Sequence, residues 1–96
     1  MRVVTVCGMG FGTSLMLLME VQAIAQKHGF SVDGEAVDLG SAKGKTCDFM
    51  VASGEIAAEL SGESVEVVAI DNLLDKQEIE AKVMPVIRRI ADTKGA

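Results

Sequence analysis

Two patterns of apolar and polar residues alternate along the chain. Short apolar or β-branched runs, which are typical of strands, occupy residues 2–6, 32–38, 48–53 and 65–70. Longer stretches with apolar residues three or four positions apart, which are typical of helices, occupy residues 15–28, 54–60 and 76–91. Strands that alternate with helices in this way predict an α/β fold with a parallel sheet and helices on both faces.

Residues that cap or break helices set the expected helix ends. Thr13 or Ser14 is expected to cap the first long helix, Gly29 to stop it, and Gly62 to close the short one. Asp75 is the expected cap of the last helix, and Pro85 inside that helix predicts a kink or a division into two. The buried face of the last helix is predicted to contain Ile79, Val83, Val86, Ile87 and Ile90.

The strands are expected to form one four-stranded sheet in the order 2-1-3-4. Residues 32–38 are interrupted by Gly34 and rich in acids, which favours a sheet edge, whereas the apolar first strand belongs in the centre. The expected architecture is a Rossmann-like or phosphatase-like three-layer sandwich formed by a single domain over residues 1–96. Residues 39–46 are a short crossover for parallel strands and are the weak point of this prediction.

The composition argues against a membrane-spanning, a secreted and a nucleic-acid-binding protein. The longest uninterrupted apolar run, residues 15–19, is far too short to span a bilayer, and the N-terminal residues lack a signal-peptide pattern. A cytoplasmic chain without direct membrane insertion is therefore expected. The net charge of −5 and the absence of Trp and Tyr argue against nucleic acid as a partner, because nucleic-acid binding uses clustered positive charge and stacking platforms.

One loop carries the candidate chemistry. Cys7 ends the first strand, and a glycine-rich stretch without any charge follows it and leads into the first helix. Glycines at positions 8, 10 and 12 permit positive φ angles, and a helix N-terminus attracts anions, so the loop is expected to hold phosphate.

Three known types of phosphate loop do not fit this stretch. The lysine of a nucleotide P-loop is missing, and the third glycine lies one residue too early for the dinucleotide fingerprint. Five residues separate Cys7 from Thr13, as in cysteine phosphatases, but the arginine that clamps the phosphoryl group there is absent. The remaining interpretation is a thiolate that accepts a phosphoryl group and hydrolyses it poorly, as in a relay.

The chain resembles a known family. The segments "VCGMGFGTSLML", "DFMVASGEIAAEL" and "VVAI" look like the IIB component of the bacterial phosphoenolpyruvate-dependent sugar phosphotransferase system, of the lactose/ascorbate type and closest to the ascorbate-specific branch. The resemblance implies that Cys7 takes a phosphoryl group from phosphohistidine of a IIA protein and passes it to the sugar held by the membrane transporter IIC. It also implies that Gly8, Met9, Gly10, Phe11, Gly12, Thr13 and Ser14 form the loop that binds the phosphoryl oxygens. No cofactor is expected, and two cysteines and one histidine this far apart in the chain argue against a conventional zinc site. The protein is expected to be cytoplasmic and to meet the membrane only through IIC.

Two other classes stay open at this stage. A low-molecular-weight cysteine phosphatase would hydrolyse an aryl phosphate, and a non-catalytic anion-binding regulatory domain would keep its target after Cys7→Ala. Cys47 is expected to be structural, since it lies at the amino end of its strand, on the opposite edge from Cys7. His28 lies about 20 Å along the helix from the loop and is expected to have no catalytic role.

The remaining candidates are assigned mainly structural roles. Leu17, Val21 and Ile24 are expected to face the sheet. Neighbouring elements are expected to bury the other apolar face, although Met9, Phe11 and Met16 could form a docking rim. Ser53 and Glu55 are expected to cap the short helix and to complement its dipole. Lys43 and Lys45 are expected to be solvated loop charges.

Overall fold

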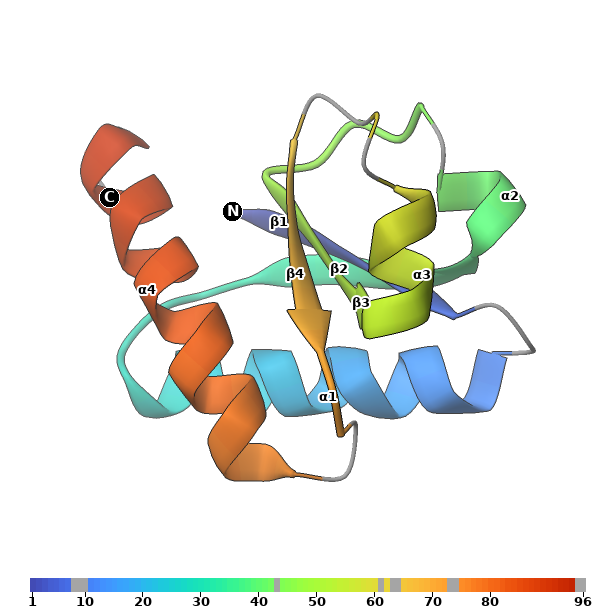
Figure 1. The fold of residues 1–96 in the computed structure, drawn as a ribbon. Coiled ribbons are helices and arrows are strands. Elements are labelled where there is room, and N and C mark those ends of the chain that lie inside the picture. Colours follow the sequence, from blue (N-terminus) through green and yellow to red (C-terminus); the bar gives the residue numbers. More distant parts are fainter. Residues whose placement is uncertain (8–10, 43, 61, 63–64, 73–74, 95–96) are drawn as a thin grey trace.

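The fold is that of a computed structural model, which describes residues 1–7, 11–42, 44–60, 62, 65–72 and 75–94, with the backbone alone described at 7, 11–14 and 94. Its strands and helices alternate, as the sequence predicts (Figure 1). The strands are β1 (Arg2–Cys7), β2 (Asp33–Asp38), β3 (Phe49–Ser53) and β4 (Glu66–Ile70). The helices are α1 (Phe11–Lys27), α2 (Leu39–Ala42), α3 (Gly54–Glu59) and α4 (Lys76–Lys94).

The four strands form one parallel sheet in the order β2-β1-β3-β4, which confirms the predicted topology. β1 is central and acid-rich β2 is an edge strand. The short crossover between β2 and β3 is possible because α2 is only one turn long. All four strands therefore end on one edge of the sheet, the carboxyl edge, which is where open parallel sheets bind ligands.

Two apolar cores lie on opposite faces of the sheet, so helices cover both faces as expected (Figure 1). On one face, α1 and α4 pack against Val3, Phe49 and Val51, which are fully buried. On the other face, α2 and α3 cover the smaller cluster of Val4, Val6, Val37, Ala42, Met50, Ala52 and Leu60. The alternation of side chains along β1 supplies both cores, because successive residues point to opposite faces.

The helix ends agree with the sequence at two positions. Gly29 has a φ of +86° and ends α1, where the N–H of Phe30 donates to the carbonyl of Ala25 at 2.8 Å. Asp75 caps α4, since its Oδ1 accepts from the backbone N–H groups of Gln77 and Glu78, both at 3.1 Å.

Other predicted ends are wrong. Of the kink or division predicted at Pro85, the division does not occur, because α4 continues through this residue as one helix. α3 ends at Glu59 with Leu60 as its C-cap, so Gly62 does not close it. The predicted buried face of α4 is correct for Ile79, Val83, Val86 and Ile87, and Ile90 is partly buried.

Gly34 lets β2 approach β1 and α1 closely. A Cβ atom built there would lie 2.6 Å from the Val3 carbonyl oxygen and 2.6 Å from Leu18 Cδ1. Because backbone would have to move, Gly34→Ala is expected to cost about 1–3 kcal/mol of unfolding free energy, measured by chemical denaturation. Gly62→Ala is the control, since nothing lies within 4 Å of its Cβ position. Equal denaturation midpoints for the two variants would contradict the close approach.

Candidate phosphoryl-transfer site

Cys7 is the last residue of the central strand and lies at the carboxyl edge of the sheet. Its neighbours in the sheet are β2 on one side and β3 on the other, so it stands where the strand order reverses. α1 begins four residues later, at Phe11. The backbone thus brings the cysteine and a helix N-terminus to the same edge.

The first helix starts earlier than the sequence predicts. It begins at Phe11 instead of residue 15, so Thr13 and Ser14 lie within its first turn and do not cap it. Gly12 is helical, so it does not use the positive φ that glycine permits. The first three N–H groups of the helix, at residues 11–13, have no acceptor within the helix and are available to an anion.

Three residues of the predicted phosphate-binding loop, Gly8, Met9 and Gly10, lie outside the described residues. Lys43, predicted as a solvated loop charge, also lies outside them. The uncharged character of the stretch is a fact of sequence: no Asp or Glu occurs between Arg2 and Glu20. Negative charge in this stretch would repel a phosphoryl group, so its absence favours anion binding.

Asp38 is the residue that the sequence reasoning missed. It ends β2 and is paired in register with Cys7, although the two are far apart in the sequence. Its Oδ1 accepts the backbone N–H of Ser41 at 2.7 Å, which caps α2. This hydrogen bond, together with one from the Ser41 hydroxyl, holds the pKa of the Asp38 carboxyl below its usual value. Only the register of the strands could have placed this carboxylate beside the cysteine.

On the other side of Cys7, β3 ends at Ser53, which is the N-cap residue of α3. Ser53 has the extended backbone of an N-cap, but its side chain makes no capping hydrogen bond. Glu55 lies in the first turn of α3, where a carboxylate complements the helix dipole. The predicted capping positions are therefore right, and the predicted side-chain cap is not formed.

The apolar face of α1 is less buried than expected. Leu17, Val21 and Ile24 do face the core, as predicted. Met16 and Met19, however, are 57% and 61% exposed, and neighbouring Leu15 is 51% exposed. The prediction that neighbouring elements bury this face is wrong, because α4 packs against the sheet beside α1 and does not cover it. We call Leu15, Met16 and Met19 the α1 patch.

His28 and Lys45 have ion-pair partners. His28 Nε2 lies 2.6 Å from Glu80 Oε2 and ties the end of α1 to α4, at the opposite end of α1 from Cys7. Lys45 Nζ lies 2.5 Å from Glu35 Oε1, so the prediction of a merely solvated charge is wrong for this residue. Cys47 precedes β3, is partly buried, and packs against the smaller core, in agreement with a structural role.

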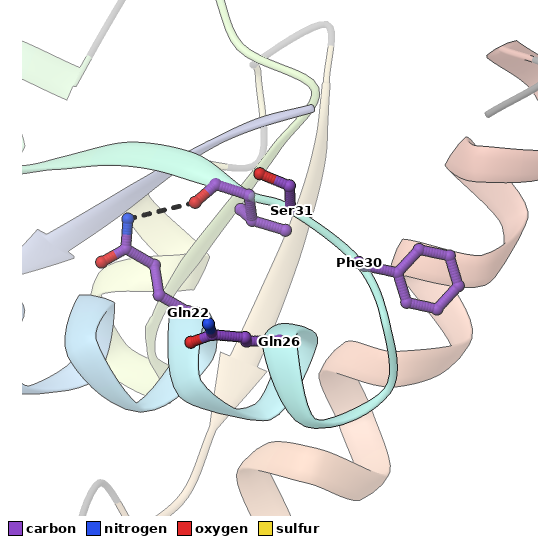
Figure 2. Close-up of a pocket in the computed structure, with 5 residues that line it drawn as sticks. Gln22, Gln26, Phe30 and Ser31 are labelled. Carbon is purple, nitrogen blue, oxygen red and sulfur yellow. Dashed lines mark hydrogen bonds between the residues drawn. The ribbon is translucent and has the colours of Figure 1, made fainter.

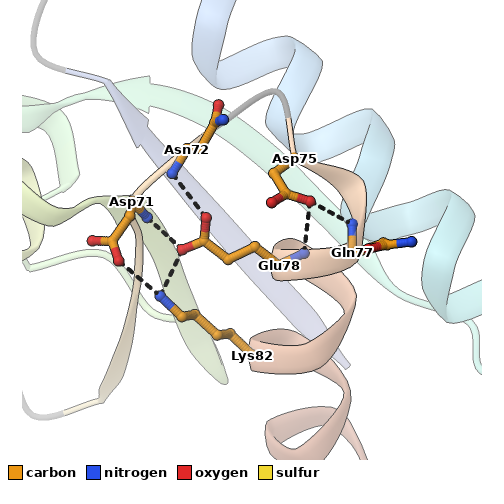
Figure 3. A network of polar contacts seen from close by, with 6 residues as sticks. All are labelled: Asp71, Asn72, Asp75, Gln77, Glu78 and Lys82. Atoms are coloured by element: carbon orange, nitrogen blue, oxygen red, sulfur yellow. Dashed lines mark hydrogen bonds and ion pairs between the residues drawn. The ribbon is translucent and has the colours of Figure 1, made fainter.

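A carboxylate from α4 fixes the backbone that follows β4 (Figure 3). Glu78 accepts the backbone N–H groups of Asp71 at 2.6 Å and of Asn72 at 2.9 Å. Lys82 Nζ lies 2.6 Å from the same carboxylate and 3.5 Å from Asp71 Oδ2. The Lys82 ammonium, followed by the two N–H groups, lowers the pKa of Glu78 from 4.5 to about 2. This cluster orders the carboxyl edge two strands away from Cys7.

The Glu78 cluster predicts a dependence of stability on pH. Because the folded-state pKa is depressed, ionised Glu78 stabilises the protein above pH 4.5, and this contribution is lost as the pH falls from about 4.5 towards about 2. Wild type is therefore expected to unfold at higher denaturant concentration than Glu78→Gln at pH 6, and the difference should vanish near pH 2. Glu59→Gln, an exposed change on α3, corrects for net charge. A difference that stays constant with pH would contradict this assignment.

A surface hollow lies away from these groups (Figure 2). It has a volume of about 360 Å³ and lies between the second half of α1 and the segment that leads into β2. Gln22 Nε2 donates to the Val32 carbonyl at 3.1 Å across it. The hollow adjoins the start of β2, whereas Cys7 pairs with the end of that strand, so it does not belong to the Cys7 site.

The fold and the carboxyl edge define a class of protein: a small parallel α/β domain with a cysteine at an anion-attracting helix N-terminus. The chain matches the family model described as "PTS system, Lactose/Cellobiose specific IIB subunit" over residues 2–84. Since this match covers most of the chain, the protein belongs to that family and is a IIB component, a phosphotransferase that carries phosphoryl groups. The IIB class implies interaction with the IIA and IIC components of the system.

Two further similarities accompany the family match. The chain is 27% identical over 90 residues to the "Ascorbate-specific PTS system EIIB component" of Mycoplasma pneumoniae, covering 91% of this chain and 95% of that protein. It is also similar to the solution structure of an enzyme IIB subunit of the PTS system from Escherichia coli K12, with 14% identity, a TM-score of 0.49, and coverage of 98% and 92% of the two chains. Within the described residues, no helix has the length and apolar character needed to cross a bilayer.

Proposed function

We propose that Cys7 is the phosphoryl acceptor, which takes the group from phosphohistidine of IIA and passes it to the sugar bound by IIC. The observation that carries this proposal is the position of Cys7 at the end of the central strand, four residues before the N-terminus of α1. The phosphate-binding stretch in this proposal is residues 8–14. A helix N-terminus also favours the thiolate, which is the nucleophilic form of cysteine.

The first step forms a P–S bond and breaks a P–N bond. The Cys7 thiolate attacks phosphorus in line, and the departing imidazole nitrogen keeps the electron pair of the P–N bond and takes up one proton from solvent. The N–H groups at residues 11–13 offset charge on the equatorial phosphoryl oxygens. In the second step a sugar hydroxyl attacks phosphorus, loses its proton to solvent, and Cys7 leaves as the thiolate.

Both partners must reach the same sulfur, so they are proposed to use overlapping surfaces in turn. A transient interface buries less than about 1,200 Å² in total, or roughly 600 Å² on each partner, which is a disc with a radius of roughly 14 Å. At 1.5 Å per residue, Met16 and Met19 lie roughly 8 and 12 Å from the start of α1, inside such a footprint. The α1 patch is therefore the proposed docking surface, on a cytoplasmic protein that meets the membrane through IIC.

L-Ascorbate is the sugar that we propose to test first. The support is the name of the Mycoplasma pneumoniae relative, which is 27% identical to this chain. Uptake of labelled ascorbate by a strain that lacks this protein, with lactose and cellobiose as comparisons, is the direct measurement. Unchanged ascorbate uptake would contradict this assignment of substrate and leave the carrier chemistry at Cys7 intact.

Phosphoryl transfer from phosphorylated IIA tests the carrier role. Mass spectrometry of proteolytic peptides is expected to locate one phosphoryl group on the peptide that contains Cys7. Rapid release of inorganic phosphate, with hydrolysis of an aryl phosphate, would instead indicate a cysteine phosphatase. No transfer at all, with anion binding retained after Cys7→Ala, would indicate a non-catalytic regulatory domain.

A further inference from the structure

A carboxylate stands beside the proposed phosphoryl acceptor at the end of the neighbouring strand. Asp38 and Cys7 are partners in the register of β2 and β1. Neighbouring strands lie about 4.8 Å apart, so the two backbone positions are closer than a Debye length at physiological salt, about 8 Å. A negative charge at Asp38 is therefore felt at Cys7.

The Asp38 carboxylate is held in place at this edge. Its Oδ1 accepts the Ser41 N–H at 2.7 Å, which makes Asp38 the N-cap of α2. The same hydrogen bond lowers the pKa of the Asp38 carboxyl below its usual value, which already lies well below neutral pH. Capping alone does not require the charge, because Asn and Ser cap helices as well as Asp does.

Among the described residues, the other charged groups at the carboxyl edge are more remote from Cys7 in the sheet. Glu55 belongs to α3, beyond β3, and Asp71 follows β4, two strands away. Lys82 of α4 is already paired with Glu78 and Asp71. The four residues of α2 are uncharged, and so are the residues of α1 before Glu20. Asp38 is thus the charged residue whose strand position adjoins Cys7.

We propose that Asp38 tunes the phosphoryl-transfer potential of Cys7, by raising the free energy of the thiolate and, more strongly, of the phosphocysteine. This inference rests on the proposed function. Phosphorylation turns a monoanionic thiolate into a phosphoryl dianion, so a fixed carboxylate nearby opposes loading from IIA and favours onward transfer. The helix N-terminus and Asp38 then act in opposite directions: one holds the phosphoryl group, and the other ensures that it is passed on.

The bonds and charges of the loading step show where Asp38 acts. The P–N bond of the donor breaks, the P–S bond at Cys7 forms, and the imidazole gains one proton from solvent. One additional negative charge appears at the cysteine. In the onward step that charge leaves with the sugar phosphate and the thiolate returns. Asp38 takes no proton and forms no bond in either step, so it is a positioning residue for charge and not a catalytic one.

Asp38→Asn separates charge from capping. Asparagine keeps an oxygen for the Ser41 N–H and removes the negative charge, and Asp38→Ser is a second neutral variant that can cap α2. The matched control is Asp33→Asn, which makes the same charge change at the opposite end of the same strand, where Asp33 pairs in register with Arg2. Denaturation of each variant verifies that the fold is kept.

Two measurements test the effect of the Asp38 charge on Cys7. The rate of Cys7 alkylation against pH, measured in a Cys47→Ser background, is expected to report a thiol pKa lower by about 0.5–1 unit in Asp38→Asn than in Asp33→Asn. The equilibrium of phosphoryl exchange with IIA is expected to shift towards phosphorylated protein by roughly 3- to 10-fold. Both differences should shrink at 1 M salt, where the Debye length is about 3 Å.

Equal thiol titrations and equal exchange equilibria in Asp38→Asn and Asp33→Asn would overturn the inference, and so would a difference that salt leaves unchanged. The titration needs no phosphoryl donor, so it tests the coupling of Asp38 to Cys7 independently of the carrier role. If phosphoryl label failed to reach Cys7 in the wild type, the proposed function would fall, and with it the role of Asp38 in phosphoryl transfer.

Discussion

Cys7→Ser is expected to abolish phosphoryl transfer from IIA while leaving the fold intact. Serine differs from cysteine by one atom, and its hydroxyl stays protonated at neutral pH, whereas the nucleophile in the proposed step is a thiolate. Because serine and cysteine are close in size, little stability should be lost on this substitution. Incubation with phosphorylated IIA followed by mass spectrometry should detect label in the wild type and none in the variant.

Cys47→Ser is the matched control for this experiment. It makes the same chemical change before β3, at the edge of the sheet opposite to Cys7, and should be labelled as fast as the wild type. His28 is the other nucleophile to watch, and it is paired with Glu80 at the far end of α1. Label on His28 or Cys47, or label that persists in Cys7→Ser, would show that the acceptor has been assigned wrongly.

The sheet could be predicted from the sequence because burial on both faces leaves a strong pattern. Residues 49–52 are apolar without interruption and are buried, as expected for an inner parallel strand. The acids around Gly34 predict that β2 is an edge strand, because an edge strand is less buried and tolerates charged residues. Gly29 and Asp75 marked helix ends correctly, because each makes a local backbone contact that its own residue type favours.

The wrong predictions concern contacts that a local pattern does not contain. The Thr-Ser pair predicts a helix that starts after it, but the helix extends back to Phe11 through Gly12, a residue of low helix propensity. Exposure of Met16 depends on where α4 packs, and the pairing of Lys45 with Glu35 depends on how the α2 crossover folds back on β2. Asp38 adjoins Cys7 only through strand register, which the order of strands does not specify.

Met16→Glu and Met19→Glu are expected to slow phosphoryl transfer from IIA by about tenfold each, the effect of losing an interfacial contact worth somewhat more than 1 kcal/mol. Both side chains are more than half exposed, so they contribute little to the core. Glutamate is also a good helix former, and the thermal stability of α1 should change little. Exposed flexible methionines suit a surface that must accept two different partners in turn.

Gln26→Glu provides the control for these two variants. Gln26 is exposed on the same helix, about two turns beyond Met19, and the change adds the same negative charge outside the α1 patch. Initial rates at several IIA concentrations separate docking from chemistry: the patch variants should need more IIA to reach half of the maximal rate, with that maximal rate preserved. If Met16→Glu and Met19→Glu transfer as fast as Gln26→Glu, the partners bind Cys7 from another side of the carboxyl edge, and the exposed methionines have no part in docking IIA.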